Sequence, residues 1–211
     1  MAIVQGKPSL PVVTAEEVTR ITVRDRTKVV TVRPNSVTVE VTRYDGYEAF
    51  REILRSVFSA VEKLLEPEGI SRLGLRYIDE IRVPHLEGPH PWDDWLDRSL
   101  LAPRVTGVST ETWGCAVQYA TGSDRHLVLR YGPGDGTVIN PAGPIKRPRP
   151  VPPGPFFALD FDSFWAPSDI PAFATEALLT ACDELRGPER ALFDQLIPEH
   201  LIKVFKEELP Q

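Results

Sequence analysis

The chain has 211 residues, of which 42% are hydrophobic and 26% are charged, and its formal net charge is −6. These values are typical of a soluble globular domain and exclude a wholly disordered chain, a collagen and a coiled coil. The net negative charge disfavours a nucleic-acid partner, because binding to phosphate backbones depends on clustered Lys and Arg. No apolar run approaches the roughly 20 residues of a membrane span, so we expect no membrane association.

Two features of the sequence indicate the cytoplasm. Residues 1–14 carry no long apolar core, so we expect a flexible tail there rather than a signal peptide. Cys115 and Cys182 lie on separate predicted elements and are expected to be free thiols, as in a reducing compartment. A homodimer is left open as an assembly.

The first part of the chain predicts strands followed by a helix. Three β-branched runs separated by short polar breaks predict an antiparallel meander with one wet face. Apolar residues then recur at steps of three and four from Tyr47 to Leu65, which predicts an amphipathic helix. Asp45 is its expected N-cap, and Pro67 with Gly69 is expected to end it. The three predicted strands are residues 18–24, 28–33 and 36–42.

Residues 72–83 form the next predicted strand, and one residue in it breaks the pattern. Apolar side chains alternate with charged ones through the stretch, which is typical of a half-buried strand. Asp79 falls in phase with the apolar residues. A carboxylate on the core side of a strand costs several kcal/mol unless it is paired or hydrogen-bonded. Asp79 is therefore the residue whose surroundings most need an explanation.

The remaining chain predicts further strands, one long loop and two helices. Residues 89–98 are expected to form a brief helix with Trp92, Trp95 and Leu96 on one side. Residues 132–155 are rich in Gly and Pro and predict an irregular loop, and loops of this length are usually functional or disordered. The predicted strands lead from Val105 into 113–119 and then cover 125–131 and 156–162. The predicted helices cover about 170–185 and 189–205, with a break at Gly187–Pro188 between them and a split or kink at Pro198.

These elements predict an α+β fold. We expect an antiparallel sheet built from two strand-meander-plus-helix halves, with the helices packed on one face. A single domain is expected over residues 15–208, with halves of about 15–85 and 104–208. No residue-level repeat connects the halves, so a structural duplication is a hypothesis.

Several segments together resemble those of a known bacterial family. They are Tyr44-Asp-Gly-Tyr, the helix that follows it, Leu73-Gly-Leu-Arg-Tyr-Ile-Asp-Glu-Ile81, Leu159-Asp-Phe-Asp162 and Glu199-His-Leu-Ile-Lys-Val-Phe205. Over roughly residues 15–208 the chain is similar to a sporadically distributed family of uncharacterised bacterial proteins whose hallmark is a GLRYIN-x-I strand. Only this strand motif is specific, and the family usually carries Asn at the position of Asp79. The resemblance implies a soluble bacterial protein and brings no established chemistry with it.

Asp79, with its neighbours Arg76 and Tyr77, is the first candidate site. On one interpretation Asp79 is an acid in a pocket between sheet and helices, with its pKa raised by burial, available for proton transfer or ligand anchoring. On the other interpretation it forms a buried ion pair, or a β-bulge turns it to water. The sequence leaves both open.

Aromatic and acidic residues on other predicted strands extend the candidate ligand-binding site. Trp113 and Tyr119, together with Tyr77, could line a cavity under the helices or could belong to the core. Asp160 and Asp162 lie two residues apart on a strand and therefore share a face, where they could bind a ligand. Two carboxylates need further oxygen ligands to hold Mg²⁺ or Ca²⁺, so neither a metal nor a cofactor is predicted.

Lys146, Arg147 and Arg149 lie in the Pro-rich part of the long loop. An extended basic segment of this kind can contact phosphate or an acidic partner, or it can dock as a polyproline ligand. A solvated lid that needs no partner is the alternative. We keep this segment as a candidate partner-binding loop.

The sequence favours a non-catalytic binding or accessory protein. Its groove or pocket between a curved sheet and helices would take a peptide, a partner protein or an apolar small molecule. The alternative is a cofactor-independent enzyme that uses Asp79 as general acid or base in an aromatic-lined pocket. Binding is favoured because the sequence contains no nucleophile elbow, P-loop, Rossmann fingerprint or metal-ligand spacing of histidines.

Overall fold

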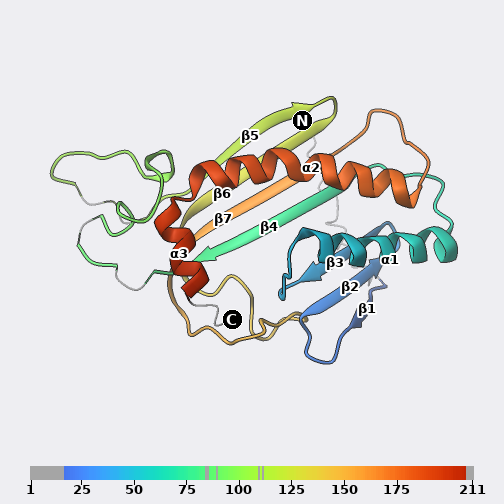
Figure 1. The fold of residues 1–211 in the computed structure, drawn as a ribbon, viewed down its shortest axis with the longest axis horizontal. Coiled ribbons are helices and arrows are strands. Elements are labelled where there is room, and N and C mark those ends of the chain that lie inside the picture. Colours follow the sequence, from blue (N-terminus) through green and yellow to red (C-terminus); the bar gives the residue numbers. More distant parts are fainter. Residues whose placement is uncertain (1–16, 84–85, 89, 109, 111, 208–211) are drawn as a thin grey trace, which may run out of the picture. The chain divides into compact units, whose positions relative to one another are not determined.

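The computed structural model describes residues 17–83, 86–88, 90–108, 110 and 112–207. The predicted tail at residues 1–14 lies outside these ranges. Antiparallel sheets and helices make an α+β fold, which confirms the predicted class (Figure 1). The chain divides into two compact units: residues up to Arg43 with Pro141–Pro148, and Tyr44–Asn140 with the residues from Arg149 onward. None of the helices in the described ranges is long and apolar enough to cross a membrane.

The first unit contains a three-stranded antiparallel meander. Its residues are β-branched at most positions, which suits extended backbone. The central strand pairs on both sides, so that Val30 lies opposite Ile21 on one neighbour and opposite Val39 on the other. The strands are β1 (Thr19–Thr22), β2 (Lys28–Arg33) and β3 (Ser36–Val41), close to the predicted ranges.

The second unit contains a four-stranded antiparallel sheet in the order β4-β7-β6-β5. Strand β4, which the sequence predicts as the last strand of the first half, pairs here with the last strand of the chain. Its register places Tyr77 opposite Phe161 and Asp79 opposite Leu159. The strands are β4 (Leu73–Ile81), β5 (Cys115–Gly122), β6 (Arg125–Gly136) and β7 (Gly154–Trp165).

Helices cover one face of this sheet. Helix α2 (Thr175–Leu196) lies over β4, β7 and β6, and α1 (Tyr47–Leu65) packs beside α2 (Figure 1). The short 3-10 helix η1 (Arg98–Leu100) and helix α3 (Glu199–Glu207) complete the unit. The core between the layers contains Ile81, Leu127, Leu129, Phe157, Leu159, Phe161, Leu196 and Leu201, with Trp92 and Leu96 from the segment before η1.

The ends of the first helix follow the prediction, but its cap does not. Helix α1 covers the predicted range, whereas its N-cap is Gly46 rather than Asp45, and no side chain caps it. The backbone of Gly46 has a φ of 97°, which glycine adopts without a steric penalty. The helix ends at Leu65, and its C-cap residue Glu66 has a left-handed φ of 44°.

The predicted break at Gly187–Pro188 is wrong, because α2 continues through both residues. A proline inside a helix removes one backbone hydrogen bond, but burial of an amphipathic face can hold the helix together. Leu185 and Glu189 are buried on either side of the proline. The predicted split at Pro198 is confirmed, since α2 ends at Leu196 and α3 begins at Glu199.

The segment before β5 and the long loop also differ from prediction. The described residues of 89–98 form turns rather than a helix, and Asp97 accepts hydrogen bonds from Ser99 to begin η1. The irregular loop is shorter than predicted because β6 extends to Gly136 and β7 begins at Gly154.

Candidate acidic site between strand β4 and helix α2

Asp79 lies on the face of β4 that α2 covers, in phase with the buried Leu75 and Ile81. The register between β4 and β7 continues through Asp79 without a bulge. Burial raises the pKa of the Asp79 carboxyl to about 6. Within the described residues no hydrogen bond or ion pair to this carboxyl offsets its burial. Asp79 is therefore an inward-facing acid.

A second acid at this site comes from helix α2, and the sequence analysis did not predict it. Glu189 is only 6% exposed. In the described part of the chain its Oε2 atom has no hydrogen-bond partner. Burial and the negative charge of Asp79 raise the pKa of Glu189 to about 8, while Arg186 and Arg190 on the same helix act in the opposite direction. The carboxylate of Asp79 on β4 thus opposes the ionisation of Glu189 on α2.

Tyr77 lies beside the acids, and Tyr44 contacts Tyr77. Tyr77 precedes Asp79 by two residues on the same face of β4, and its hydroxyl oxygen lies 3.3 Å from that of Tyr44. The two rings pack edge to face with centroids 5.6 Å apart. Burial raises the pKa of Tyr77 well above its ordinary value, and the Tyr44 hydrogen bond and the charge on Glu189 add to this. The site therefore places the neutral phenol of Tyr77 next to the two acids.

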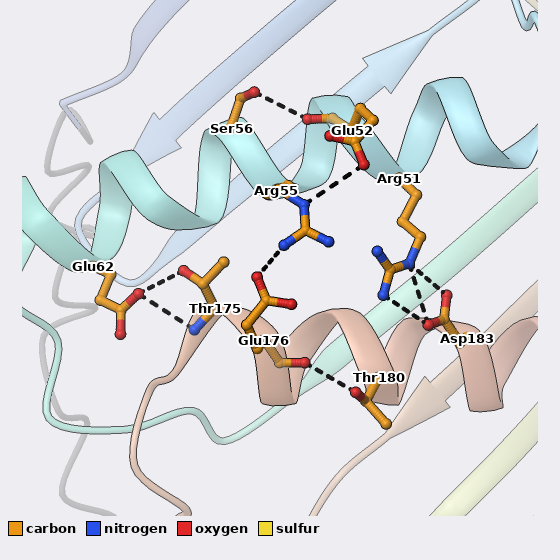
Figure 2. Close-up of polar contacts among 9 residues, drawn as sticks. All are labelled: Arg51, Glu52, Arg55, Ser56, Glu62, Thr175, Glu176, Thr180 and Asp183. Atoms are coloured by element: carbon orange, nitrogen blue, oxygen red, sulfur yellow. Dashed lines mark hydrogen bonds and ion pairs between the residues drawn. The ribbon is translucent and has the colours of Figure 1, made fainter.

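A polar cluster fixes the first turns of α1 against α2 (Figure 2). The Arg51 guanidinium donates to both carboxylate oxygens of Asp183, at 2.9 Å from Nε and 3.0 Å from Nη2. Tyr47 donates its hydroxyl to the same carboxylate at 2.7 Å. These hydrogen bonds hold the pKa of Asp183 below its usual range. The cluster positions the segment from Tyr44 to Tyr47 beside the acidic site.

The far end of the same helix pair has a second set of contacts (Figure 2). Glu62 of α1 accepts hydrogen bonds from the backbone N–H of Thr175, at 3.3 Å, and from its hydroxyl. Arg55 pairs with Glu176 between the two ends. Because later residues of α1 meet earlier residues of α2, the helices are antiparallel.

Arg76, Asp160 and Asp162 lie on the opposite face of the sheet from Asp79, since their positions alternate with it along the strands. The guanidinium of Arg76 makes two hydrogen bonds of 2.7 Å to Asp160. Arg130 lies 3.8 Å from each of the two aspartates. Arg76 therefore does not share a face with Asp79, because residues an odd number of positions apart on a strand point to opposite faces.

Asp160 and Asp162 do share a face, as predicted, and ion pairs occupy both. Asp162 also lies 3.5 Å from Arg72. No group of three or more His, Cys, Asp or Glu side chains that could hold a metal ion occurs among the described residues.

Trp113 and Tyr119 lie far from Asp79 in strand order, on or beside β5 at the other edge of the sheet. Trp113 packs on Phe157 with ring centroids 5.6 Å apart, within the core. Tyr119 is 39% exposed. The aromatic residue next to the acids is instead Tyr77, which Tyr44 contacts.

The basic loop is divided between the two units, with Lys146 and Arg147 in the first and Arg149 in the second. The backbone N–H of Lys146 donates to the carbonyl of Arg26 at 2.8 Å, and Arg26 Nε donates to the carbonyl of Pro144 at 2.9 Å. The side chains of Lys146 and Arg149 are exposed. The loop is thus attached to the β1–β2 turn through its backbone.

A depression of about 290 Å³ lies at another place in the second unit, beside the N-terminal half of α2. An ion pair between Arg125 and Glu184 borders it, and Arg125 also lies over the Trp165 ring at 5.5 Å. None of the residues that the sequence analysis chose as site residues lines this depression. Its remaining lining residues are Pro171, Ala172, Ala177, Leu178, Thr180 and Ala181.

Both cysteines are free thiols, as predicted: Cys115 is exposed and Cys182 is buried. No family model, curated protein or solved structure matches the chain. The resemblance to the bacterial family with the GLRYIN-x-I strand therefore stays a prediction.

Proposed function

We propose that the protein is a non-catalytic binding protein that holds its ligand at the acidic site formed by Asp79, Glu189 and Tyr77. The observation that supports this most is Oε2 of Glu189, a buried carboxyl oxygen with no hydrogen-bond partner in the described structure. Buried polar atoms are normally satisfied, and leaving one unpaired costs about 1–3 kcal/mol. A ligand that donates a hydrogen bond would remove this cost.

The position of the site also supports a binding role. Two buried acids with raised pKa values destabilise the fold at neutral pH, and apolar residues at these positions would stabilise it. Groups with strongly perturbed pKa values cluster at functional sites. Asp79 is half-buried rather than fully enclosed, so one side of the pair remains accessible to water.

Native mass spectrometry of the gently purified protein tests the proposal. We expect a bound molecule on the wild-type protein that is reduced or absent in Asp79→Asn and Glu189→Gln variants. Both changes keep the side-chain shape, and each removes one ionisable group. Asp169→Asn is the matched control because Asp169 is exposed and outside the site. Equal retention of the molecule in all four proteins would contradict the proposal.

One observation favours a second candidate function, a cofactor-independent acid–base enzyme. The pKa values of about 6 for Asp79 and about 8 for Glu189 lie on either side of neutrality. Pairs of carboxyl groups with separated pKa values can act as base and acid in one reaction. An enzyme would convert the bound molecule to a product of different mass, and Asp79→Asn would stop this conversion while the fold stays intact.

A further inference from the structure

We propose that the ligand of the acidic site presents a cationic nitrogen, an alkylammonium or guanidinium group, which binds between the carboxyl groups of Asp79 and Glu189. This inference rests on the proposed function and names the chemistry of its ligand. Two sources can supply such a group: a small amine, or a Lys or Arg side chain of a peptide.

The charges around the two acids favour a cationic ligand. The nearest cations of Glu189 belong to its own helix, and both have other partners. Arg186 lies over the ring of Tyr47 at 4.4 Å, and Arg190 donates to Asp194 at 2.8 Å. Among the described residues no cation forms an ion pair with Asp79 or Glu189. A buried acid without a counter-charge is stabilised most by a cation that also donates hydrogen bonds.

The oxygen atoms of the site suit a group with several donors. An ammonium has three N–H donors and no acceptor. The unpartnered Oε2 of Glu189, the carboxylate of Asp79 and the hydroxyl of Tyr77 are all oxygen acceptors. The rings of Tyr44 and Tyr77 pack edge to face beside these oxygens, and a cation is attracted to the electron-rich face of an aromatic ring. An anionic ligand would meet two acids and is disfavoured.

The affinity for a cationic ligand should depend on pH, because Glu189 must ionise when the ligand binds. At neutral pH Asp79 is mostly ionised and Glu189 mostly neutral, because their pKa values are about 6 and about 8. A bound cation favours the ionised form of Glu189, so binding releases a proton. The association constant should therefore rise about tenfold between pH 7 and pH 9. The groups that face Glu189 are Asp79 and Tyr77 on β4 and Arg186 and Arg190 on α2. Asp79, with a pKa of about 6, is already mostly ionised at pH 7, and the raised pKa of Tyr77 keeps its phenol neutral up to pH 9.

Titration calorimetry with simple probes tests the inference. Butylammonium represents a small amine, Nα-acetyl-lysine methylamide represents a peptide side chain, and butan-1-ol is the neutral isostere. We expect millimolar binding of a cationic probe, no binding of butan-1-ol, and proton release measured by comparing buffers of different ionisation enthalpy. The tighter of the two cationic probes shows which source the site suits.

Variants of the two acids test whether the cationic probe binds at this site. Asp79→Asn and Glu189→Gln should weaken the cationic probe by about tenfold or more, and Glu189→Gln should abolish proton release. Asp169→Asn should leave both quantities unchanged. Thermal unfolding of each variant shows that it is folded before binding is measured.

Two results would overturn the cation inference: absence of binding by either cationic probe up to pH 9, or equal binding by wild type and both site variants. The proposed function has a separate outcome. A neutral or anionic molecule that co-purifies with the wild-type protein and is lost from Asp79→Asn would uphold the binding function while the cation inference fails.

Discussion

At the scale of single residues, Asp79 and Glu189 make stability depend on pH. Their ordinary pKa values of 3.8 and 4.5 apply to the unfolded chain, and burial raises the folded values to about 6 and about 8. Between these limits the folded protein holds protons that the unfolded chain has released. Stability therefore falls as pH rises from about 4 to about 8. The loss is complete only above the folded pKa of Glu189.

Glu189→Gln should remove most of this pH dependence. Because Gln carries no proton to lose, the free energy of unfolding of the variant should increase relative to wild type as pH rises from 5 to 8. The expected gain is of the order of a few kcal/mol, since each pKa unit corresponds to about 1.4 kcal/mol. Urea unfolding of both proteins at pH 5, 6, 7 and 8 measures the difference.

An exposed residue supplies the control for this measurement. Glu68 is exposed and follows the end of α1. Glu68→Gln should show a difference from wild type that does not change with pH. A pH-independent difference for Glu189→Gln as well would show that the acid pair does not determine the pH dependence.

At the scale of elements, α2 depends on α1 for its N-terminal cap. The N-cap residue Ala174 has no side chain that can accept a hydrogen bond. Glu62 of α1 accepts from the backbone N–H and hydroxyl of Thr175 instead (Figure 2). A carboxylate at a helix N-terminus satisfies a free N–H group and interacts favourably with the helix dipole. The cap thus links the two helices that flank the acidic site.

Removing the Glu62 carboxylate should lower the free energy of unfolding by about 1 kcal/mol, the usual value of an N-terminal cap. The test compares Glu62→Ala, Thr175→Val and the double variant by urea unfolding at pH 7. Because both residues share one interaction, the two single effects should add up to more than the double effect. Additive changes in the free energy of unfolding would show that Glu62 stabilises the fold by an interaction other than the cap. Glu68→Ala is the control, because it measures the effect of removing an exposed carboxylate.

At the scale of the whole molecule, local patterns predicted the elements and missed their partners. Alternation and three- and four-residue steps depend only on neighbouring residues, so the strands, α1 and the inward orientation of Asp79 could be predicted. The pairing of β4 with β7 depends on residues about 80 positions apart and leaves no local signal. Arg76 could have been excluded from the sequence, because it is an odd number of residues from Asp79 on one strand.

Glu189 was missed for a different reason. It lies on the buried stripe of α2, seven residues after Cys182 and four after Leu185, so a helical pattern contains it. Because the sequence analysis expected a break at Gly187–Pro188, it placed Glu189 on a separate helix from Cys182 and Leu185. A continuous helix would have revealed a second acid in phase with apolar residues, which is the same signal that identified Asp79.

Residues 141–148 belong to the first compact unit, and Arg26 connects this segment to the β1–β2 turn. Arg26 has a φ of 59°, a left-handed conformation that Asn adopts more readily than most residues. Arg26→Asn should therefore keep the turn while removing the bonds from the guanidinium to the carbonyls of Gly143 and Pro144.

The N–H of Lys146 is bonded to the carbonyl of Arg26. We expect amide hydrogen exchange at Lys146 to become about tenfold faster or more in this variant. The reason is that a hydrogen bond to a charged group contributes about 1.5–3 kcal/mol to the stability of the segment. Mass spectrometry of peptides covering 141–148 and β2 measures the effect. Exchange in β2 should stay unchanged, and Arg24→Asn, which alters an exposed arginine before the same turn, should leave both peptides at wild-type rates. Unchanged exchange of 141–148 in Arg26→Asn would mean that backbone contacts alone hold the segment. In that case the conformation of the segment that a partner of the basic loop would bind does not depend on the Arg26 side chain.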